Sequence, residues 1–349
     1  MKVDYIIVGL GLAGLAFAEQ LLKKSKSFLL FEDGSQQASR VAAGVYNPLV
    51  LKRFTKVWDA ADQLAIALPF YRELEERFQI KLDHKLDILR VFKSVEEQNN
   101  WFHISDQPFF ADYMIPRVFK NANPQVIAPF DYGRMTNTGK MDIALLLNAY
   151  RSYLEDQGTL IPEHFDHNAI QFSEHSVLYH NIQASKVVFC EGYGLKDNPF
   201  FRNTGLQEAK GELLTIHAPG LRVTDILKSL VFVLPLGNDY YRVGATFNWA
   251  DKTNEPSEEG REELVEKLRK VIRVDFEVTE QSAGIRPAVK DRRPLLGRHP
   301  VYRQLAILNG LGTRGVMLAP KMAKLLYEHL EFDTALPPEV RFDRFHKAE

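Results

Sequence analysis

The chain has 349 residues, of which 45% are hydrophobic and 26% are charged. This composition is typical of a soluble globular protein of about two domains, and it excludes an intrinsically disordered or collagen-like chain. The 44 Lys and Arg residues and the 45 Asp and Glu residues sum to a net charge of −1, so no overall field attracts nucleic acid or an anionic membrane.

A single cysteine, Cys190, excludes an internal disulfide and a metal site built from several cysteines. Reducing, cytoplasmic surroundings are therefore expected. The histidines show no metal-ligand spacing, so no metal site is expected. The apolar stretch from Tyr5 to Leu15 is interrupted by glycines and lacks a cleavage site, and no stretch reaches the roughly 18 apolar residues of a membrane span, so neither a signal peptide nor a membrane segment is expected.

The chain opens with the pattern strand, turn, helix, strand. Tyr5 to Val8 is a β-branched run that predicts a buried strand. A helix is predicted from Leu12 to about Lys24, and a second buried strand from Ser27 to Phe31. An alanine- and glycine-containing loop follows over residues 38–48.

The middle of the chain alternates helical and irregular stretches. Apolar spacing predicts helices from about Trp58 to Phe78 and from Asp142 to Leu154, and Lys186 to Cys190 reads as another buried strand. The aromatic, proline-marked region of about 80–135 is expected to belong to a second domain.

The last third begins with an antiparallel pattern. Leu230–Leu236 and Tyr240–Phe247 alternate around a Gly-Asn-Asp turn, which predicts a hairpin, and Glu258–Ile272 predicts a charged helix. A strand at Leu305–Leu308, a glycine-rich turn and a helix at about Val316–Leu330 then repeat the arrangement of the N-terminus.

The segment from Gly9 to Gly14 reads G-x-G-x-x-G between a predicted strand and a predicted helix, and the next strand ends at Glu32-Asp33. This context indicates dinucleotide binding: Gly9 permits a tight turn, Gly11 leaves room for a pyrophosphate at the helix N-terminus, and Gly14 allows close helix packing. Glu32 is placed to accept hydrogen bonds from ribose hydroxyls, which disfavours NADP. The fingerprint alone leaves NAD and FAD open.

Further blocks accompany the fingerprint: Ala42-Ala43-Gly44, Lys210-Gly211-Glu212, Ala283–Pro300 and Asn309–Pro320. With them the chain resembles the D-amino-acid oxidase-like family of FAD-dependent oxidoreductases, and within it most closely the glycine oxidase branch and the oxidase-domain branch of bifunctional tRNA wobble-uridine-modifying enzymes. The resemblance runs in blocks across nearly the whole chain.

The resemblance implies an α/β fold with a Rossmann-like FAD-binding domain of the glutathione-reductase type and an inserted antiparallel-sheet substrate domain. The FAD-binding domain is expected to comprise residues 1–80, 136–208 and 276–349, and the substrate domain residues 81–135 and 209–275.

The resemblance also implies noncovalent FAD and an inert Cys190. In the family, the turn Gly310-x-Gly312-x-x-Gly315 directs the amides of the following helix at the flavin pyrimidine edge. The expected cofactor-binding residues are Gly9, Gly11, Leu12, Ala13, Gly14, Glu32, Asp33, Ala43, Gly44, Val45, Gly192, Gly310, Leu311, Gly312, Thr313, Arg314, Gly315 and Val316.

Four residues are the expected substrate contacts. By resemblance, the fork of Arg286 holds a substrate carboxylate. Arg314 contacts the flavin, the substrate or neither. Phe232, which stands where glycine oxidase has a tyrosine, and Phe247 are either a pocket wall or ordinary core residues.

The function implied is oxidation of a primary or secondary amine next to a carboxylate, as in a D-amino acid, glycine or sarcosine, by hydride transfer to flavin N5. O₂ or another acceptor then reoxidises the flavin, and no side chain is assigned as catalytic acid or base. One alternative is oxidation of a carboxymethylaminomethyl group on tRNA, which the net charge disfavours but does not exclude. The other is a flavin-binding protein without turnover.

Overall fold

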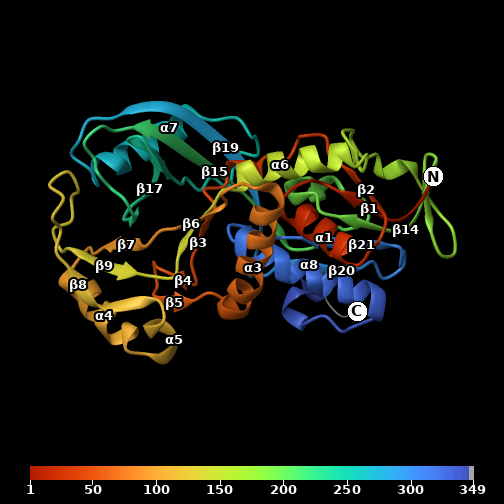
Figure 1. Cartoon of the computed structure of the whole chain (residues 1–349), viewed down its shortest axis with the longest axis horizontal. Helices are drawn as coiled ribbons and strands as arrows, with labels where there is room; N and C mark the ends of the chain where they lie inside the picture. The colour runs from red at the N-terminus through yellow and green to blue at the C-terminus, as the bar shows by residue number, and fades with distance from the viewer. Residues whose placement is uncertain (346–349) are drawn as a thin grey trace.

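A computed structural model describes residues 1–345 of the chain, arranged as two lobes that each contain a large mixed sheet (Figure 1). No helix in these residues combines the length and the apolar character needed to cross a bilayer.

The first sheet has a parallel centre in the order β11-β2-β1-β14, with β21 parallel to β14 and antiparallel strands at its margins. Its strands are β1 (Lys2–Val8), β2 (Phe28–Phe31), β11 (Leu160–Ile161), β12 (Ile170–Phe172), β13 (Val177–Tyr179), β14 (Ile182–Phe189), β20 (Leu295–Arg298) and β21 (Leu305–Asn309). Segments from the start, middle and end of the chain thus lie side by side (Figure 1).

The side chains of β1 alternate between two cores, as a strand buried on both faces requires. Tyr5 and Ile7 pack with the helices of one face, and Ile6 and Val8 pack with aromatic residues of the other, so the predicted buried strand is confirmed. The helices of the first face are α1 (Leu12–Lys23), α3 (Ala60–Phe78), α6 (Ile143–Asp156) and α8 (Gly315–Phe332).

The second sheet has the order β19-β15-β18-β17-β16-β7-β9-β8. Its strands are β7 (Ile88–Val91), β8 (Met114–Phe119), β9 (Tyr132–Met135), β15 (Leu206–His217), β16 (Ile226–Lys228), β17 (Phe232–Gly237), β18 (Tyr240–Gly244) and β19 (Glu277–Val289). The helices of this lobe are α4 (Val95–Ser105), α5 (Pro108–Ala111) and α7 (Glu258–Arg269).

Shorter elements complete the chain. They are α2 (Ala38–Val41), the small sheet of β3 (Val45–Tyr46), β10 (Gly139–Met141) and β6 (Asp83–Lys85), the pair β4 (Leu49–Val50) and β5 (Thr55–Lys56), and the 3₁₀ turns η1 (His167–Ala169), η2 (Gly192–Asp197), η3 (Pro338–Val340) and η4 (Phe342–Phe345).

Most predicted elements are present, and their ends shift for local reasons. The hairpin is confirmed, because β17 and β18 pair antiparallel around Asn238 and Asp239, which both have positive φ. The helix predicted from Trp58 begins at Ala60 instead, because the left-handed backbone of Asp59 (φ 54°) cannot continue a helix.

The strand β19 links the two lobes. Although residue 276 is the expected start of an FAD-binding segment, residues 277–289 pair with β15 in the second sheet along its whole length. We therefore place β19 with the second sheet and keep the rest of the domain division as a proposal.

Candidate functional site

A cavity of about 680 Å³ is lined by residues of both sheets. The turns after β1, β2, β14 and β21 form one end of it, which is the edge of a parallel sheet where nucleotides bind. One face of β15, β16, β17 and β18 contributes to the other end. The predicted site residues that line it are Gly9, Gly11, Leu12, Ala13, Glu32, Ala43, Gly44, Val45, Gly192, Phe232, Phe247, Arg286, Leu311, Gly312, Thr313, Arg314, Gly315 and Val316.

The first glycine turn is fixed by close packing at two of its three glycines. Gly9 has a φ of 101°, and a Cβ on Gly14 would lie 1.9 Å from the carbonyl oxygen of Gly9. Gly14 itself does not line the cavity, which agrees with a packing role. A Cβ on Gly11 would meet the side chain of Ser39, at 3.1 Å from Oγ and 3.9 Å from Cβ, and Gly11 itself lines the cavity.

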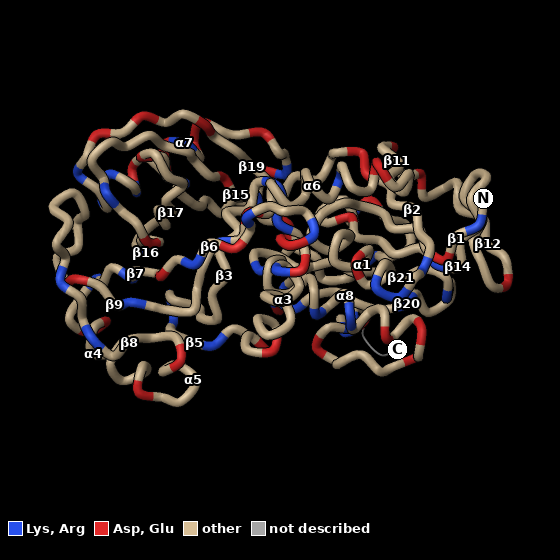
Figure 2. The backbone as a smooth tube through the Cα atoms, viewed as in Figure 1, with Lys and Arg blue, Asp and Glu red and all other residues tan. Residues whose placement is uncertain are grey.

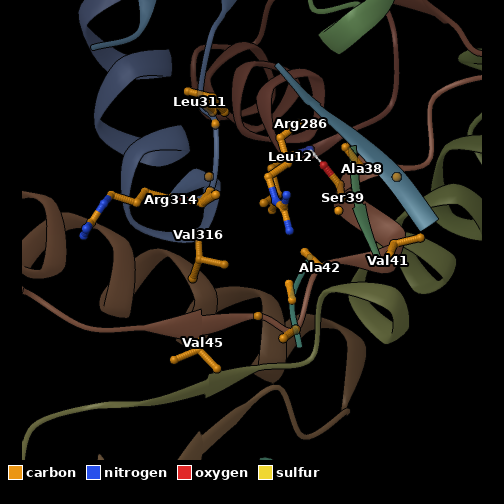
Figure 3. Close-up of a pocket in the computed structure, with 18 of the residues that line it drawn as sticks. Leu12, Ala38, Ser39, Val41, Ala42, Val45, Arg286, Leu311, Arg314 and Val316 are labelled. Atoms are coloured by element: carbon orange, nitrogen blue, oxygen red, sulfur yellow. Dashed lines mark hydrogen bonds between the residues drawn. The ribbon is translucent and has the colours of Figure 1, made fainter. Parts of the chain in front are cut away.

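Ser39 joins the site although the sequence placed it only within a loop. The backbone N–H of Leu12, at the N-terminus of α1, donates to Ser39 Oγ over 3.2 Å (Figure 3). The free amides of a helix N-terminus carry partial positive charge, and a hydroxyl beside them offers another donor. This arrangement suits a bound phosphate group.

The two acids after β2 take different positions. Glu32 is buried at the cavity, where its carboxylate accepts hydrogen bonds from the N–H of Leu10 (2.5 Å) and of Gly34 (2.8 Å). Asp33 instead contacts His164 (2.8 Å) and the N–H of Ser35, so the structure does not bring it to the cavity.

The second glycine turn brings another helix N-terminus to the same end. Gly310 and Gly312 both have positive φ, and a Cβ on Gly315 would lie 2.9 Å from Leu12 Cδ1, so α8 begins beside the start of α1. Gly310 lies outside the cavity lining, where its Cβ would collide with Val289.

Asn309 connects this turn to the turn after β14. Its side-chain amide donates to the carbonyl of Gly192 (3.0 Å), and its side-chain oxygen accepts from the N–H of Gly310 (2.7 Å). Asn309 lines the cavity and was missing from the predicted site, although it is the first residue of the segment 309–320 that carries part of the family resemblance.

These residues fit an extended dinucleotide. The cavity volume lies within the usual range for ligand sites, Gly11 lines the cavity, and two helix N-termini supply amide donors. Within residues 1–345, no cluster of His, Cys, Asp and Glu side chains suits a metal ion.

Arg286, on β19, stands at the cavity end formed by the second sheet, without an acidic partner among the described residues. Its Nη1 donates to the carbonyl of Thr246 (3.2 Å), its guanidinium lies 4.3 Å from the centre of the Phe247 ring, and Gly211 leaves the space it occupies. Burial lowers the pKa of Arg286 to about 10, still well above neutrality. Figure 3 shows the guanidinium directed toward the space between Ala42 and Val316.

Arg314 does not join Arg286 in one clamp. The two side chains point in different directions (Figure 3), and no ion pair to Arg314 is found within residues 1–345. Burial and the nearby Arg292 lower the pKa of Arg314 to about 10.

The remaining wall combines apolar and basic side chains. Phe232 and Phe247 both line the cavity, which favours the pocket-wall interpretation over a core position. Lys228 also lines it and was missed, because a lysine just before a hairpin reads as a surface residue. Burial, with the neighbouring charges of Arg90 and Lys93, lowers the pKa of Lys228 to about 8.

Cys190 is buried at the end of β14, and burial and the neighbouring Glu191 raise the pKa of its thiol well above the usual value. The thiolate, the nucleophilic form, is therefore strongly disfavoured. This placement agrees with the expected inert thiol.

A family model described as "FAD dependent oxidoreductase" (DAO) matches residues 4–329. A bifunctional protein of tRNA 5-methylaminomethyl-2-thiouridine biosynthesis from Marinobacter nauticus is 21% identical over 93% of this chain, which spans 55% of that protein's length. The glycine oxidase of Bacillus subtilis is 24% identical over 99% of this chain and 97% of its own. The glycine oxidase structure from Geobacillus kaustophilus superposes with a TM-score of 0.79 at 20% identity, covering 96% of each chain.

Proposed function

The chain belongs to the FAD-dependent oxidoreductase family, and from that premise we propose that it oxidises an amine on the carbon next to a carboxylate. The observation that carries this proposal is Arg286, a largely buried guanidinium that lines the cavity with no acidic partner among the described residues. A buried cation without a counter-charge is costly, and a carboxylate ligand removes that cost.

FAD, when bound, supplies the two-electron oxidant that turns the amine into an imine. At the cavity end formed by the turns after β1, β2, β14 and β21, here called the dinucleotide end, Gly11, Ser39 and the amides at the start of α1 would hold the phosphates, and Glu32 would accept hydrogen bonds from the ribose. Gly312 and the first amides of α8, in the second glycine turn, would stabilise negative charge on the reduced cofactor.

Arg286 binds and orients the substrate. Its planar fork offers two parallel N–H donors to one carboxylate, which restricts rotation of the amine-bearing carbon as well as its position. The Thr246 carbonyl and the Phe247 ring hold the guanidinium in place. Phe247 and Thr246 are therefore positioning residues.

The rest of the wall offers apolar contacts to the substrate and supplies no carboxylate base. Leu213, Phe232 and Ile226 line the cavity, and Glu32 is the sole carboxylate among its described lining residues. Because Glu32 is held by two backbone amides at the dinucleotide end, no acidic side chain stands ready to remove a proton from the amine. Catalysis then depends on positioning and electrostatics.

The direct test is anaerobic reduction of the purified, FAD-loaded protein. D-amino acids, L-amino acids, glycine, sarcosine and proline are added one at a time, and loss of the flavin's visible absorption identifies a substrate. We expect bleaching only by amines that carry a neighbouring carboxylate. Bleaching by their decarboxylated analogues at the same rate contradicts the proposal.

The same experiment addresses the noncatalytic alternative, for which no amine bleaches the flavin. Oxidation of a tRNA group requires a surface that attracts RNA. Figure 2 shows Lys and Arg interspersed with Asp and Glu along the backbone of both lobes, and the net charge of −1 gives no overall field that attracts RNA. We therefore favour a free small-molecule amine, with O₂ or another compound as the electron acceptor.

A further inference from the structure

The cavity wall formed by β15 to β19, here called the substrate-side wall, carries a second cation, Lys228, that the proposed function leaves without a role. It lies at the end of β16 and lines the cavity, with Nζ 5.8 Å from the centre of the Phe232 ring. Within residues 1–345 its ammonium has no hydrogen bond or ion pair. Lysines that are largely withdrawn from water without a partner are rare, because the charge loses its hydration.

The acids near Lys228 are committed to other cations. Arg90 is paired across the strands with Lys228 in the register of β7 and β16, and its guanidinium holds Glu97 at 2.6 Å. Asp87 and Asp225, at the starts of the same two strands, bind Arg134. The adjacent strand β17 carries no charged residue. Among the described residues, the acids of β7, β16 and β17 and of the turns before them therefore leave the charge of Lys228 without a partner.

The strand register places Lys228 on the same face as Arg286 and at a definite separation from it. Lys228 pairs with Phe232, Phe232 with Gly244, and Gly244 with Leu213. Paired positions lie on the same face of a sheet, so these four positions share one face of the second sheet. The Arg286 guanidinium lies over Gly211, two residues before Leu213 on β15. With neighbouring strands about 4.8 Å apart, the backbones of β15 and β16 are roughly 14 Å apart, and both long side chains reach inward to reduce that gap.

Between the two cations the wall is apolar. A Cβ on Gly244 would lie 2.1 Å from Leu213 Cδ2 and 3.1 Å from the Phe232 ring, so these two side chains meet over that glycine. A ligand along this wall thus finds a positive charge at each end and hydrocarbon in the middle.

We propose that Lys228 binds a second carboxylate of the substrate, so that the amine oxidised is an amino dicarboxylate. The proposal rests on the proposed function, in which Arg286 binds the carboxylate next to the amine. Burial beside Arg90 and Lys93 holds the pKa of Lys228 near 8, so the ammonium is charged at neutral pH and gains most from an anionic ligand. The substrate class includes aspartate, glutamate and N-carboxymethyl amino acids.

The first test measures binding without turnover. Succinate and glutarate, and the matched monocarboxylates propanoate and butanoate, are titrated calorimetrically into the FAD-loaded protein. We expect the dicarboxylates to bind about 10- to 100-fold more tightly, and Lys228→Met to remove that preference while leaving propanoate affinity unchanged. Lys228→Arg retains a charge and should keep part of the preference.

Lys93→Met is the matched control, because Lys93 contributes to the charge around Lys228 but does not line the cavity. It should leave the dicarboxylate preference nearly unchanged. Equal binding of di- and monocarboxylates by the wild-type protein, or a preference that survives Lys228→Met, overturns the proposal.

The second test compares flavin reduction by aspartate, glutamate and iminodiacetate with reduction by alanine, glycine and sarcosine. We expect Lys228→Met to raise KM for the dicarboxylates alone. An equal loss of kcat for every amine, with succinate affinity intact, overturns the proposal in favour of a proton-accepting lysine; slowed reoxidation alone overturns it in favour of a role in oxygen reactivity. If no amine reduces the flavin but a Lys228-dependent succinate preference remains, the proposed function fails and the dianion site stands.

Discussion

The two ends of the cavity are built by different means. The dinucleotide end consists mainly of backbone, namely glycine turns and helix N-termini that follow parallel strands, with a few polar side chains such as Glu32 and Ser39. The substrate-side wall consists of side chains on β15 to β19, brought together by strand register. In a site built from backbone, neighbouring side chains can vary but the glycines themselves tolerate little substitution. In a wall built from side chains, single groups can be removed without loss of the fold. The expected effects of substitution therefore differ in kind between the two ends.

The largest effect is expected at Gly14. A valine there places its Cβ 1.9 Å from the carbonyl oxygen of Gly9, so α1 must move away from the sheet. We expect Gly14→Val to lower the free energy of unfolding by more than about 3 kcal/mol and to yield colourless protein. Thermal unfolding and FAD content measure this.

Gly158→Ala is the control for this change, because Gly158 has a φ of 64° but open space around it. Gly158→Ala should lower the free energy of unfolding by only about 1–2 kcal/mol and leave FAD bound. Normal FAD content in Gly14→Val contradicts the packing role.

Arg286→Ala is expected to act at the other end alone. Removal of the guanidinium leaves the substrate carboxylate unpaired, so KM should rise by a factor corresponding to about 2–5 kcal/mol, while FAD content stays unchanged. Arg286→Lys keeps a charge without the planar fork, and its KM should lie between those of the wild-type protein and Arg286→Ala. Arg292→Ala removes an exposed arginine that does not line the cavity, and should have little effect on KM. An unchanged KM in Arg286→Ala excludes the assigned role.

The pH dependence should separate the two cations. Protonated Lys228 attracts the second carboxylate, so the affinity for succinate should be level below pH 8 and fall by up to about tenfold per unit above it. Propanoate, bound through Arg286 with its pKa of about 10, should show no fall between pH 8 and 9. Calorimetric titrations of succinate and of propanoate from about pH 6 to about pH 9 measure both affinities. Parallel pH profiles for the two ligands contradict the assignment.

A smaller effect is expected from the ring that supports the guanidinium. Phe247 is 58% exposed, so its burial contributes little to the stability of the fold, and its ring contacts the guanidinium of Arg286. Phe247→Ala should raise KM by a factor corresponding to about 0.5–2 kcal/mol with little change in the melting temperature. Trp249→Ala, an exposed aromatic outside the cavity lining, is the matched substitution. Equal effects of the two substitutions argue against a positioning role.

The smallest effect is expected at Cys190. The buried thiol, whose pKa is raised, should resist alkylation in the folded protein, and Cys190→Ala should retain FAD. Denaturation should release the cofactor from the wild-type chain, as noncovalent binding requires. Mass spectrometry of the denatured chain checks this, and a mass that still includes FAD contradicts noncovalent binding.

The same contrast explains what the sequence could predict. Gly9, Gly11 and Gly14 lie within six consecutive residues, and their spacing between a predicted strand and a predicted helix indicates the turn and its use. Ser39 reaches the helix N-terminus through a loop whose path has no local signal. Lys228 shares a sheet face with Arg286 only because the five strands β15 to β19 pair in one particular register, and the sequence around a lone lysine gives no sign of that register. Asn309 lay within a recognised block, and its two hydrogen bonds to neighbouring turns became visible only in three dimensions.

The order of strands in the first sheet has a consequence for biosynthesis. β1, β14 and β21 lie side by side, yet the last of them ends at Asn309 and the helix that completes the dinucleotide end begins only at Gly315. The ribosome must therefore extend the chain beyond residue 315 before both glycine turns can contribute to one dinucleotide site. Until β21 has been synthesised, the edge of β14 with which it pairs lacks that strand partner.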